Sequence, residues 1–325
     1  MSEPTTRPLV LDVDGTMIRS DLTHELLFEG FRAARPWDWP RLLKLGLTDK
    51  PELKREFVQR IGHRIDVDLH PLEPLAVNLA KEAKADGRDV YLCSGSEQSL
   101  VERLAARLPY VDGAFGTTPG YNMTAQNKAD FLEERFPDGF DYVGNSSQDY
   151  EPWEAAHTAY AIRPPEDAEF KRSASGKPVV VLEHRYSALG GLSYRGAFQF
   201  AGYLLSGVIF ATTLFSPYSP DWVPLPAMDE RFHFDLALAA VAAATLFLAA
   251  TLLLMLSRMR QDRVSGAPNA LSEGRIGLTT VLRSIAALVL VGLVALWAVA
   301  RAYVAAAGVL LAALLFLGFL WRAKR

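Results

Sequence analysis

Four long apolar stretches lie after residue 195 of this 325-residue chain, and they limit its possible folds more than any other feature. A helix needs about 20 mostly apolar residues to cross a bilayer, with a range of about 17–25. Buried helices of a large soluble core are the alternative, but such a core rarely carries four of these segments in one block. The sequence therefore predicts an all-α, four-helix transmembrane domain over residues 196–325. Its spans are expected at about 198–215, 234–256, 284–300 and 303–321.

The basic residues beside these stretches predict an orientation. Cytoplasmic loops carry an excess of Lys and Arg. Arg185 and Arg195 precede the first stretch, the loop "SRMRQDRVSGAPNALSEGR" follows the second, and the basic tail "WRAKR" follows the fourth. With four spans all three regions fall on one side, although Arg301 lies in the opposite turn. We expect a multi-pass protein of the inner or plasma membrane, with both termini and residues 1–195 cytoplasmic. The single cysteine, Cys93, fits a reducing compartment.

Residues 1–195 have the pattern of an α/β domain. Short apolar runs are expected as strands over 9–13, 89–96, 140–149 and 158–162, with "VVVLEH" as an edge strand. Amphipathic helices are expected between them, over 74–86 and 96–108. Alternating strands and helices predict a Rossmann-like parallel sheet. The net charge of -3, from 34 basic and 37 acidic residues, gives no indication of nucleic-acid binding.

Polar side chains gather where these strands end. In parallel sheets, ligands bind at the carboxyl ends of the strands. Carboxylate and amide oxygens suit Mg²⁺, which binds through one or two carboxylates together with substrate phosphate. A lysine, a serine and exposed backbone amides suit the phosphate itself. The residues concerned are Asp12, Asp14, Ser94, Gly95, Lys128, Asn145 and Asp149.

Each of these signals has a structural alternative. Asp12 and Asp14 could form only a polar turn, and Ser94 could cap the following helix. Lys128 could be a solvated helix residue, and "GNSSQD" could be an Asx-type turn. The complete order of motifs along the chain is much more specific than any one of them.

That order resembles the four motifs of the haloacid dehalogenase-like (HAD) phosphatase superfamily, over residues 8–163. "DVDGT" resembles the first motif, "LCSGS" the second, "NK" at 127–128 the third and "GNSSQD" the fourth. The departure is Asn145, where Asp is commoner, and this removes one negative charge from the metal site. The resemblance implies Asp12 as nucleophile, Asp14 as general acid/base, Ser94, Gly95 and Lys128 as phosphate-binding groups, and Asp12, Asp14, Asn145 and Asp149 as Mg²⁺ ligands.

The spacing of the motifs describes a cap. The interval from Asp12 to Ser94 leaves room for a helical insert at about 20–72, in which Asp21 is expected to cap the first helix. Within it, "PWDWPRLLKLGL" places Trp37 and Trp39 beside basic and leucine residues. Packing in the cap core is the favoured interpretation. The alternative is an interfacial segment that dips into lipid headgroups and lets a lipid-borne phosphate reach the site.

A second resemblance concerns the loop after the second apolar stretch. "SRMRQDRVSGAPNALSEGRIG" is similar to a degenerate form of a loop in UbiA-type polyprenyl transferases. Asp262, Arg263 and "NALSEG" fit, whereas the earlier Asp positions are occupied by Leu254, Met255 and Arg258. HAD domains of this kind are fused to such transferases. The resemblance implies a truncated relative that has lost prenyl transfer and keeps a lipid-facing role.

Three functions follow as hypotheses. The first is a membrane-anchored, Mg²⁺-dependent phosphatase acting on a phosphorylated lipid or lipid-linked sugar, with polyprenyl-phosphoryl-5-phosphoribose suggested by the family. The second is a non-catalytic membrane partner of a polyprenyl-transferase pathway. The third is a tethered phosphatase of soluble substrates. Membrane lipids are expected partners, and a homo-oligomer or an association with an enzyme of that pathway is left open.

Overall fold

The computed structural model describes residues 7–165, 179–183, 230–266, 270–274 and 276–299. The chain forms two compact units. The first comprises Met1–Gly191 with Arg263–Leu278, and the second comprises Leu192–Asp262 with Thr279–Arg325. The spans predicted at 198–215 and 303–321 lie outside the described residues.

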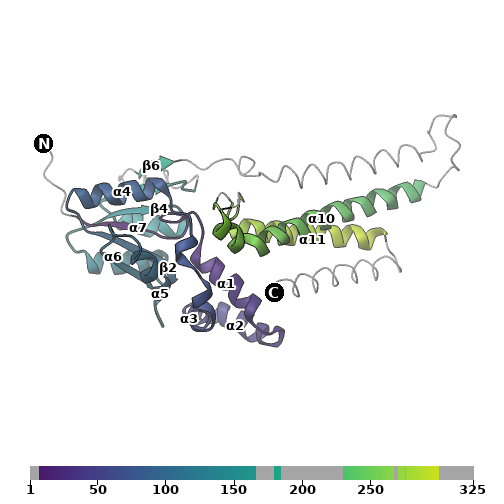
Figure 1. The fold of residues 1–325 in the computed structure, drawn as a ribbon, viewed down its shortest axis with the longest axis horizontal. Coiled ribbons are helices and arrows are strands. Elements are labelled where there is room, and N and C mark those ends of the chain that lie inside the picture. Colours follow the sequence, from purple (N-terminus) through teal and green to yellow (C-terminus); the bar gives the residue numbers. More distant parts are fainter. Residues whose placement is uncertain (1–6, 166–178, 184–229, 267–269, 275, 300–325) are drawn as a thin grey trace. The chain divides into compact units, whose positions relative to one another are not determined.

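A six-stranded sheet with parallel pairing throughout forms the centre of the first unit (Figure 1). Its strand order, β3-β2-β1-β4-β5-β6, is the doubly wound order of a Rossmann-like fold. The predicted α/β fold class of this region is therefore confirmed, including the edge strand, which is β6. The strands are β1 (Leu9–Leu11), β2 (Val90–Glu97), β3 (Gly113–Thr117), β4 (Asp141–Gly144), β5 (Thr158–Ile162) and β6 (Val179–Glu183).

Helices cover both faces of this sheet because its strands are apolar on both sides. Leu9 and Leu11 of β1 join one core cluster, which includes residues of α4 (Pro74–Ala85) and α5 (Gln98–Ala105). Val10 points the other way, into a cluster with residues of α6 and α7. A strand buried on both faces is typical of parallel sheets. The helices of this second face are α6 (Ala125–Arg135) and α7 (Tyr150–Ala155), which follows the short 3₁₀ turn η4 (Ser147–Asp149).

The segment between β1 and α4 folds as the predicted helical cap. Asp21 caps α1 as expected, since its Oδ1 accepts a hydrogen bond of 2.7 Å from the backbone N of His24. The cap consists of α1 (Leu22–Ala33), η1 (Pro36–Asp38), α2 (Trp39–Thr48), α3 (Lys50–Ile61), η2 (Gly62–Arg64) and η3 (Val67–Leu69).

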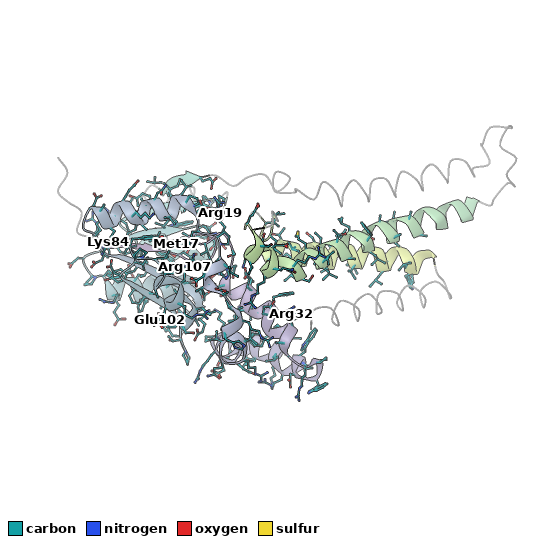
Figure 2. The ribbon with its side chains drawn as sticks, in the orientation of Figure 1. Met17, Arg19, Arg32, Lys84, Glu102 and Arg107 are labelled. Atoms are coloured by element: carbon teal, nitrogen blue, oxygen red, sulfur yellow. The ribbon has the colours of Figure 1, made fainter. Side chains whose placement is uncertain are left out.

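Backbone and arginine contacts join the cap to the core. The chain enters and leaves the cap side by side, because the backbone N of Arg19 donates to Pro71 O at 2.8 Å and that of Glu73 to Met17 O at 2.9 Å. Arg103 of α5 donates to two backbone carbonyl oxygens of the cap's last segment. Arg107, which follows α5, donates to a third one. Arg19 and Arg107 are labelled in Figure 2. These contacts fix both connections between cap and core.

The favoured interpretation of the cap tryptophans, packing in the cap core, is wrong for Trp37. Its side chain is 72% exposed, and that of Trp39 is 40% exposed. Trp39 contacts Phe31 of the cap twice, through an edge-to-face arrangement at a centroid distance of 6.2 Å and through a 3.2 Å hydrogen bond from its Nε1 to Phe31 O. Leu42 is the residue of α2 that supplies the buried contact.

A segment distant in sequence completes the first unit. Arg263 forms a bidentate ion pair with Glu25 of α1, at 2.8 and 2.7 Å, and both side chains are buried. Glu25 also lies 3.6 Å from His70, whose Nδ1 shares a 2.5 Å hydrogen bond with the Ser20 hydroxyl. Burial lowers the pKa of His70, so this imidazole is neutral near pH 7. Arg263 is therefore the cation that balances the buried Glu25 carboxylate.

Replacing Arg263 with Met is expected to lower the free energy of unfolding by about 3–5 kcal/mol, because one buried charge would lose its partner. Intrinsic tryptophan fluorescence of the detergent-solubilised full-length chain would measure the loss. Arg32→Met is the matched control, since Arg32 pairs with Glu29 near the surface, where such pairs contribute about 0–1 kcal/mol. Equal losses in the two variants would contradict the prediction.

The second unit contains most of two long helices, α10 (Glu230–Ser265) and α11 (Leu278–Val299). Leu238–Ser265 and Leu278–Trp297 are long and apolar enough to cross a membrane, by length and composition. They coincide with the second and third predicted spans. The four-span topology and the orientation stay predictions.

Candidate active site

The site is built around the carboxyl end of the central strand β1. Asp12 follows this strand directly, and its backbone N donates to Val143 O at 2.9 Å, which ties it to β4. Because β1 pairs with β2 on one side and β4 on the other, residues that follow these strands meet at one edge of the sheet. The structure thus brings together the groups predicted after each strand.

Lys128 is the cation of this edge. Its Nζ donates to Asp12 Oδ1 at 2.7 Å and lies 3.3 Å from Asp149 Oδ1, and its side chain is only 3% exposed. Burial opposes its charge, but Asp12 and Asp149 raise the pKa of Lys128 well above its ordinary value. The solvated-helix alternative for Lys128 is therefore wrong.

Asp149 has donors on both of its carboxylate oxygens. Oδ1 accepts a 2.7 Å hydrogen bond from the Tyr142 hydroxyl, and Oδ2 accepts from the backbone N of Asn145 and of Ser146, at 3.0 and 2.9 Å. Although burial raises it, the pKa of Asp149 is held below its ordinary value by Lys128 and these donors. In this arrangement Asp149 orients Lys128 and the turn after β4, and its direct ligation of a metal stays a prediction.

Asp14 has a different environment from Asp12. Its Oδ2 accepts hydrogen bonds from the hydroxyls of Ser94, at 2.9 Å, and Ser96, at 2.7 Å. Its Oδ1 accepts from the backbone N of Leu22, at 2.6 Å, where α1 begins. Three neutral donors thus hold Asp14, whereas a lysine holds Asp12. Ser94 does not cap α5, because Glu97 occupies that position.

The two carboxyl groups have raised and unequal pKa values in the metal-free chain. Burial, aided by repulsion from Asp149 and Asp14 and opposed by Lys128, raises the pKa of Asp12 to about 8. Burial and the charge of Asp21 raise the pKa of Asp14 to about 6, against its hydrogen bonds to Ser96, Leu22 and Ser94. A carboxyl group with a pKa near neutrality can both give and take a proton at working pH. Asp14 therefore has the properties of a general acid/base.

A lysine of the cap reaches the same edge, and the sequence did not reveal it. Lys54 of α3 donates to Gly95 O at 2.5 Å and to Asn122 Oδ1 at 3.0 Å. Burial lowers the pKa of Lys54 to about 8, despite the charges of Asp14 and Asp21. Gly95 is closely surrounded, since a Cβ there would lie 2.6 Å from Thr124 Cγ2. A buried cation beside the predicted phosphate-binding residue Gly95 is suited to contact a substrate.

The amide of Asn145 lies against the turn that follows Asp14. Gly15 has a φ of +81°, and a Cβ at Gly15 would lie only 2.1 Å from Asn145 Nδ2. Asn145 Oδ1 is buried and has no hydrogen-bond partner in the described part of the chain. A buried oxygen without a donor is costly, and a hard cation would satisfy it.

Asp12, Asp14 and Asn145 therefore fit a divalent cation such as Mg²⁺. Among the described residues no group of three His, Cys, Asp or Glu side chains forms a metal site by itself. Mg²⁺ commonly keeps several waters and takes further oxygen ligands from a substrate phosphate. The amide and carboxylate oxygens of this edge are compatible with such a partial set of protein ligands.

No protein-family model matches the chain. Over 175 residues, or 54% of its length, the chain is 31% identical to a curated protein of Sinorhizobium fredii (strain NBRC 101917 / NGR234) named "Uncharacterized protein y4nM". The match takes in 33% of that protein, so the chain spans about a third of the length of this curated relative.

Solved structures that match the chain include a HAD-family hydrolase and phosphoserine phosphatases. HAD family hydrolase t0658 of Salmonella enterica subsp. enterica serovar Typhi is 21% identical, with 52% of this chain and 66% of that chain covered and a TM-score of 0.39. A phospho-aspartyl intermediate analogue of phosphoserine phosphatase is 16% identical, with 58% and 99% covered and a TM-score of 0.40. A probable phosphoserine phosphatase of Vibrio cholerae is 16% identical, with 57% and 63% covered and a TM-score of 0.38.

The raised pKa of Asp12 predicts a pH-dependent stability. In the unfolded chain this carboxyl group ionises near pH 3.8, and in the metal-free folded chain near pH 8. The folded state therefore holds an extra proton between these values, and its stability falls as pH rises through this window. Relative to Asp12→Asn, the wild type is expected to lose stability from about pH 6 to pH 8.

Adding Mg²⁺ is expected to restore the stability of the wild type at pH 8, because a cation binds the ionised carboxylate of the folded state. Thermal unfolding in EDTA and in Mg²⁺, followed by tryptophan fluorescence, would measure both effects. The comparison with Asp12→Asn removes the contribution of His70, which is common to both chains. Parallel pH curves for the two chains in EDTA would contradict the prediction.

Proposed function

We propose that this chain is a membrane-anchored phosphatase that hydrolyses a phosphomonoester through an aspartyl-phosphate intermediate. One observation carries the proposal: the buried carboxyl group of Asp12 and the half-buried one of Asp14 lie at the end of the central strand with different partners. Asp12 contacts a buried ammonium group and Asp14 contacts neutral donors. This difference separates a nucleophile from an acid/base.

In the first step Asp12 attacks phosphorus. Oδ1 of Asp12 is held by Lys128, whereas Oδ2 lies 3.5 Å from the Thr16 hydroxyl, at the limit of a hydrogen bond, and is the oxygen free to react. As its bond to phosphorus forms, the bond from phosphorus to the substrate oxygen breaks. Asp14 donates its proton to that oxygen, and the alcohol leaves.

In the second step the ionised Asp14 takes a proton from water, and the hydroxide attacks phosphorus. The bond between phosphorus and Asp12 breaks, which releases phosphate and the Asp12 carboxylate. Lys128 offsets the negative charge that gathers on the transferring oxygens, where most of the catalysis of phosphoryl transfer lies. A Mg²⁺ ion held by Asp12, Asp14 and Asn145 would supply further positive charge there.

A phosphorylated lipid or lipid-linked sugar is the proposed substrate. The support comes from the two helices of the same chain that are apolar and long enough to span a membrane. The similarity of the loop around Arg263 to UbiA-type transferases adds polyprenyl-phosphoryl-5-phosphoribose as a specific candidate. The proposed location is the inner or plasma membrane, with the site on the cytoplasmic side.

The test is phosphate release by the purified full-length chain in lipid nanodiscs. We expect release from p-nitrophenyl phosphate in Mg²⁺ and none in EDTA. A phosphorylated polyprenyl lipid placed in the nanodisc should be hydrolysed with a higher kcat/KM than a water-soluble phosphate of the same headgroup. Equal values would support a tethered phosphatase of soluble substrates. No release from any phosphomonoester would favour the non-catalytic membrane partner.

A further inference from the structure

An exposed apolar stripe runs along α2 of the cap. Trp39, Leu43 and Leu47 are four residues apart and so share one face of the helix. Their side chains are 40%, 55% and 86% exposed. Trp37, 72% exposed, lies two residues before the helix. These four residues are called the α2 stripe.

The buried packing of α2 in the cap does not come from the leucines of the α2 stripe, and of the stripe's members Trp39 contacts Phe31 of α1. Leu42, on another side of the helix, is fully buried in the main core cluster. Single exposed apolar residues are normal on protein surfaces, but a row of large ones along one helix marks an interaction site.

Basic side chains lie among the residues of the α2 stripe. Arg41 and Lys44 are both exposed, and Trp39–Thr48 contains no acidic residue. Arg41 pairs with Glu56 of α3, and the guanidinium of Arg35 lies 5.6 Å from the centre of the Trp37 ring. Tryptophan and leucine on one face with lysine and arginine beside them is the pattern of a helix that lies at a bilayer surface.

We propose that the α2 stripe rests in the headgroup region of an anionic lipid bilayer. The chain has two helices suited to span a membrane, so a bilayer lies within its reach. A second copy of the chain would bring Arg41 and Lys44 opposite the same cations, and like charges across an interface are unfavourable. Anionic headgroups complement these cations, which favours the bilayer as the partner.

This proposal extends the proposed function and rests on it. A cap at the bilayer surface would bring the candidate site close to lipid phosphates. α2 packs beside α3, and α3 carries Lys54 to Gly95 of the candidate site. The same part of the cap would thus contact lipid on its outer side and the phosphate-binding edge on its inner side. Through this arrangement a lipid-borne phosphate would reach Asp12 without leaving the bilayer.

The test uses the chain's reactivity toward thiol labels. Cys93 is fully buried and burial raises its pKa to about 12, so an introduced surface cysteine is labelled selectively. Leu47→Cys places an environment-sensitive fluorophore on the α2 stripe at a position that does not support folding. Glu133→Cys, on the exposed side of α6, is the matched control.

Full-length protein carrying each label would be reconstituted into nanodiscs that contain phosphatidylserine and a headgroup-proximal nitroxide lipid. We expect severalfold stronger quenching of the label at position 47 than of the label at position 133, and weaker quenching in phosphatidylcholine nanodiscs. Equal, weak quenching at both positions would overturn the proposal. Protection of position 47 that rises with protein concentration in detergent would overturn it in favour of a second copy.

Phosphate release from p-nitrophenyl phosphate, measured on the same samples, separates this proposal from the proposed function. Quenching at position 47 without phosphate release leaves the bilayer contact standing and refutes the phosphatase. Phosphate release without quenching refutes the bilayer contact alone.

Discussion

Asp12→Asn is expected to abolish phosphate release, with a loss of at least about 10⁴-fold, comparable to the loss of a nucleophile in other covalent mechanisms. An amide cannot form the phosphorus–oxygen bond that Asp12 makes in the first step. The fold should survive the change, because burial already favours the uncharged form of Asp12 in the metal-free chain. Asn can still accept the hydrogen bond that Lys128 donates to Asp12 Oδ1.

This combination of lost activity and retained stability distinguishes a nucleophile from a structural residue. The measurement is phosphate release in Mg²⁺ together with thermal unfolding of the same preparation. Asp138→Asn, an exposed residue outside the regular elements, is a control with the same change of charge. If Asp12→Asn released phosphate at the wild-type rate, the catalytic assignment would fail.

Lys128→Met is expected to remove activity and to destabilise the first unit by about 3–5 kcal/mol. Its ammonium contacts Asp12, Asp149 and the Tyr142 hydroxyl, all of which are buried. Without the ammonium, the buried Asp149 carboxylate would lose its counter-ion and would take up a proton. The expected activity loss is about 10²–10³-fold, as for removal of one group that stabilises transition-state charge.

Two further variants test the predicted effects of Lys128→Met. Lys84→Met removes the same charge from the Asp112 ion pair, whose members are 39% and 31% exposed, and should change the stability little because solvent screens this pair (Figure 2 labels Lys84). Adding Asp149→Asn to Lys128→Met should recover part of the stability but not the activity. A Lys128→Met protein as stable as Lys84→Met would refute the role of Lys128 as a buried counter-ion.

The order of motifs was sufficient to predict much of the fold. Val10 and its neighbours in β1 are apolar on both faces, and this pattern is typical of the centre of a parallel sheet. The helix expected over 74–86 is α4, followed by Gly87 with a φ of +75°, and Asp21 caps α1 as predicted. Local rules were enough here because each feature depends on residues close in sequence.

Features that depend on distant contacts were not predictable. Lys54 lies in an amphipathic helix, where a lysine is normally solvated, and only the packing of the cap brings it to Gly95. Ser96 follows Ser94 on the same face of β2, and this period of two was an available signal for its contact with Asp14. Trp37 was expected to be buried because aromatic residues usually are, but side-chain type alone does not specify which face of a helix is covered.

The ion pair between Glu25 and Arg263 has a consequence for synthesis of the protein. The two residues are 238 positions apart, and strands β2 to β6 lie between them in the chain. At about 5–20 residues per second, roughly 12–50 s separate their emergence during translation. The Glu25 side chain therefore has no Arg263 partner until the end of α10 has been made. Completion of the first unit is therefore a late event in translation, although Asp12, its proposed nucleophile, lies near the start of the sequence.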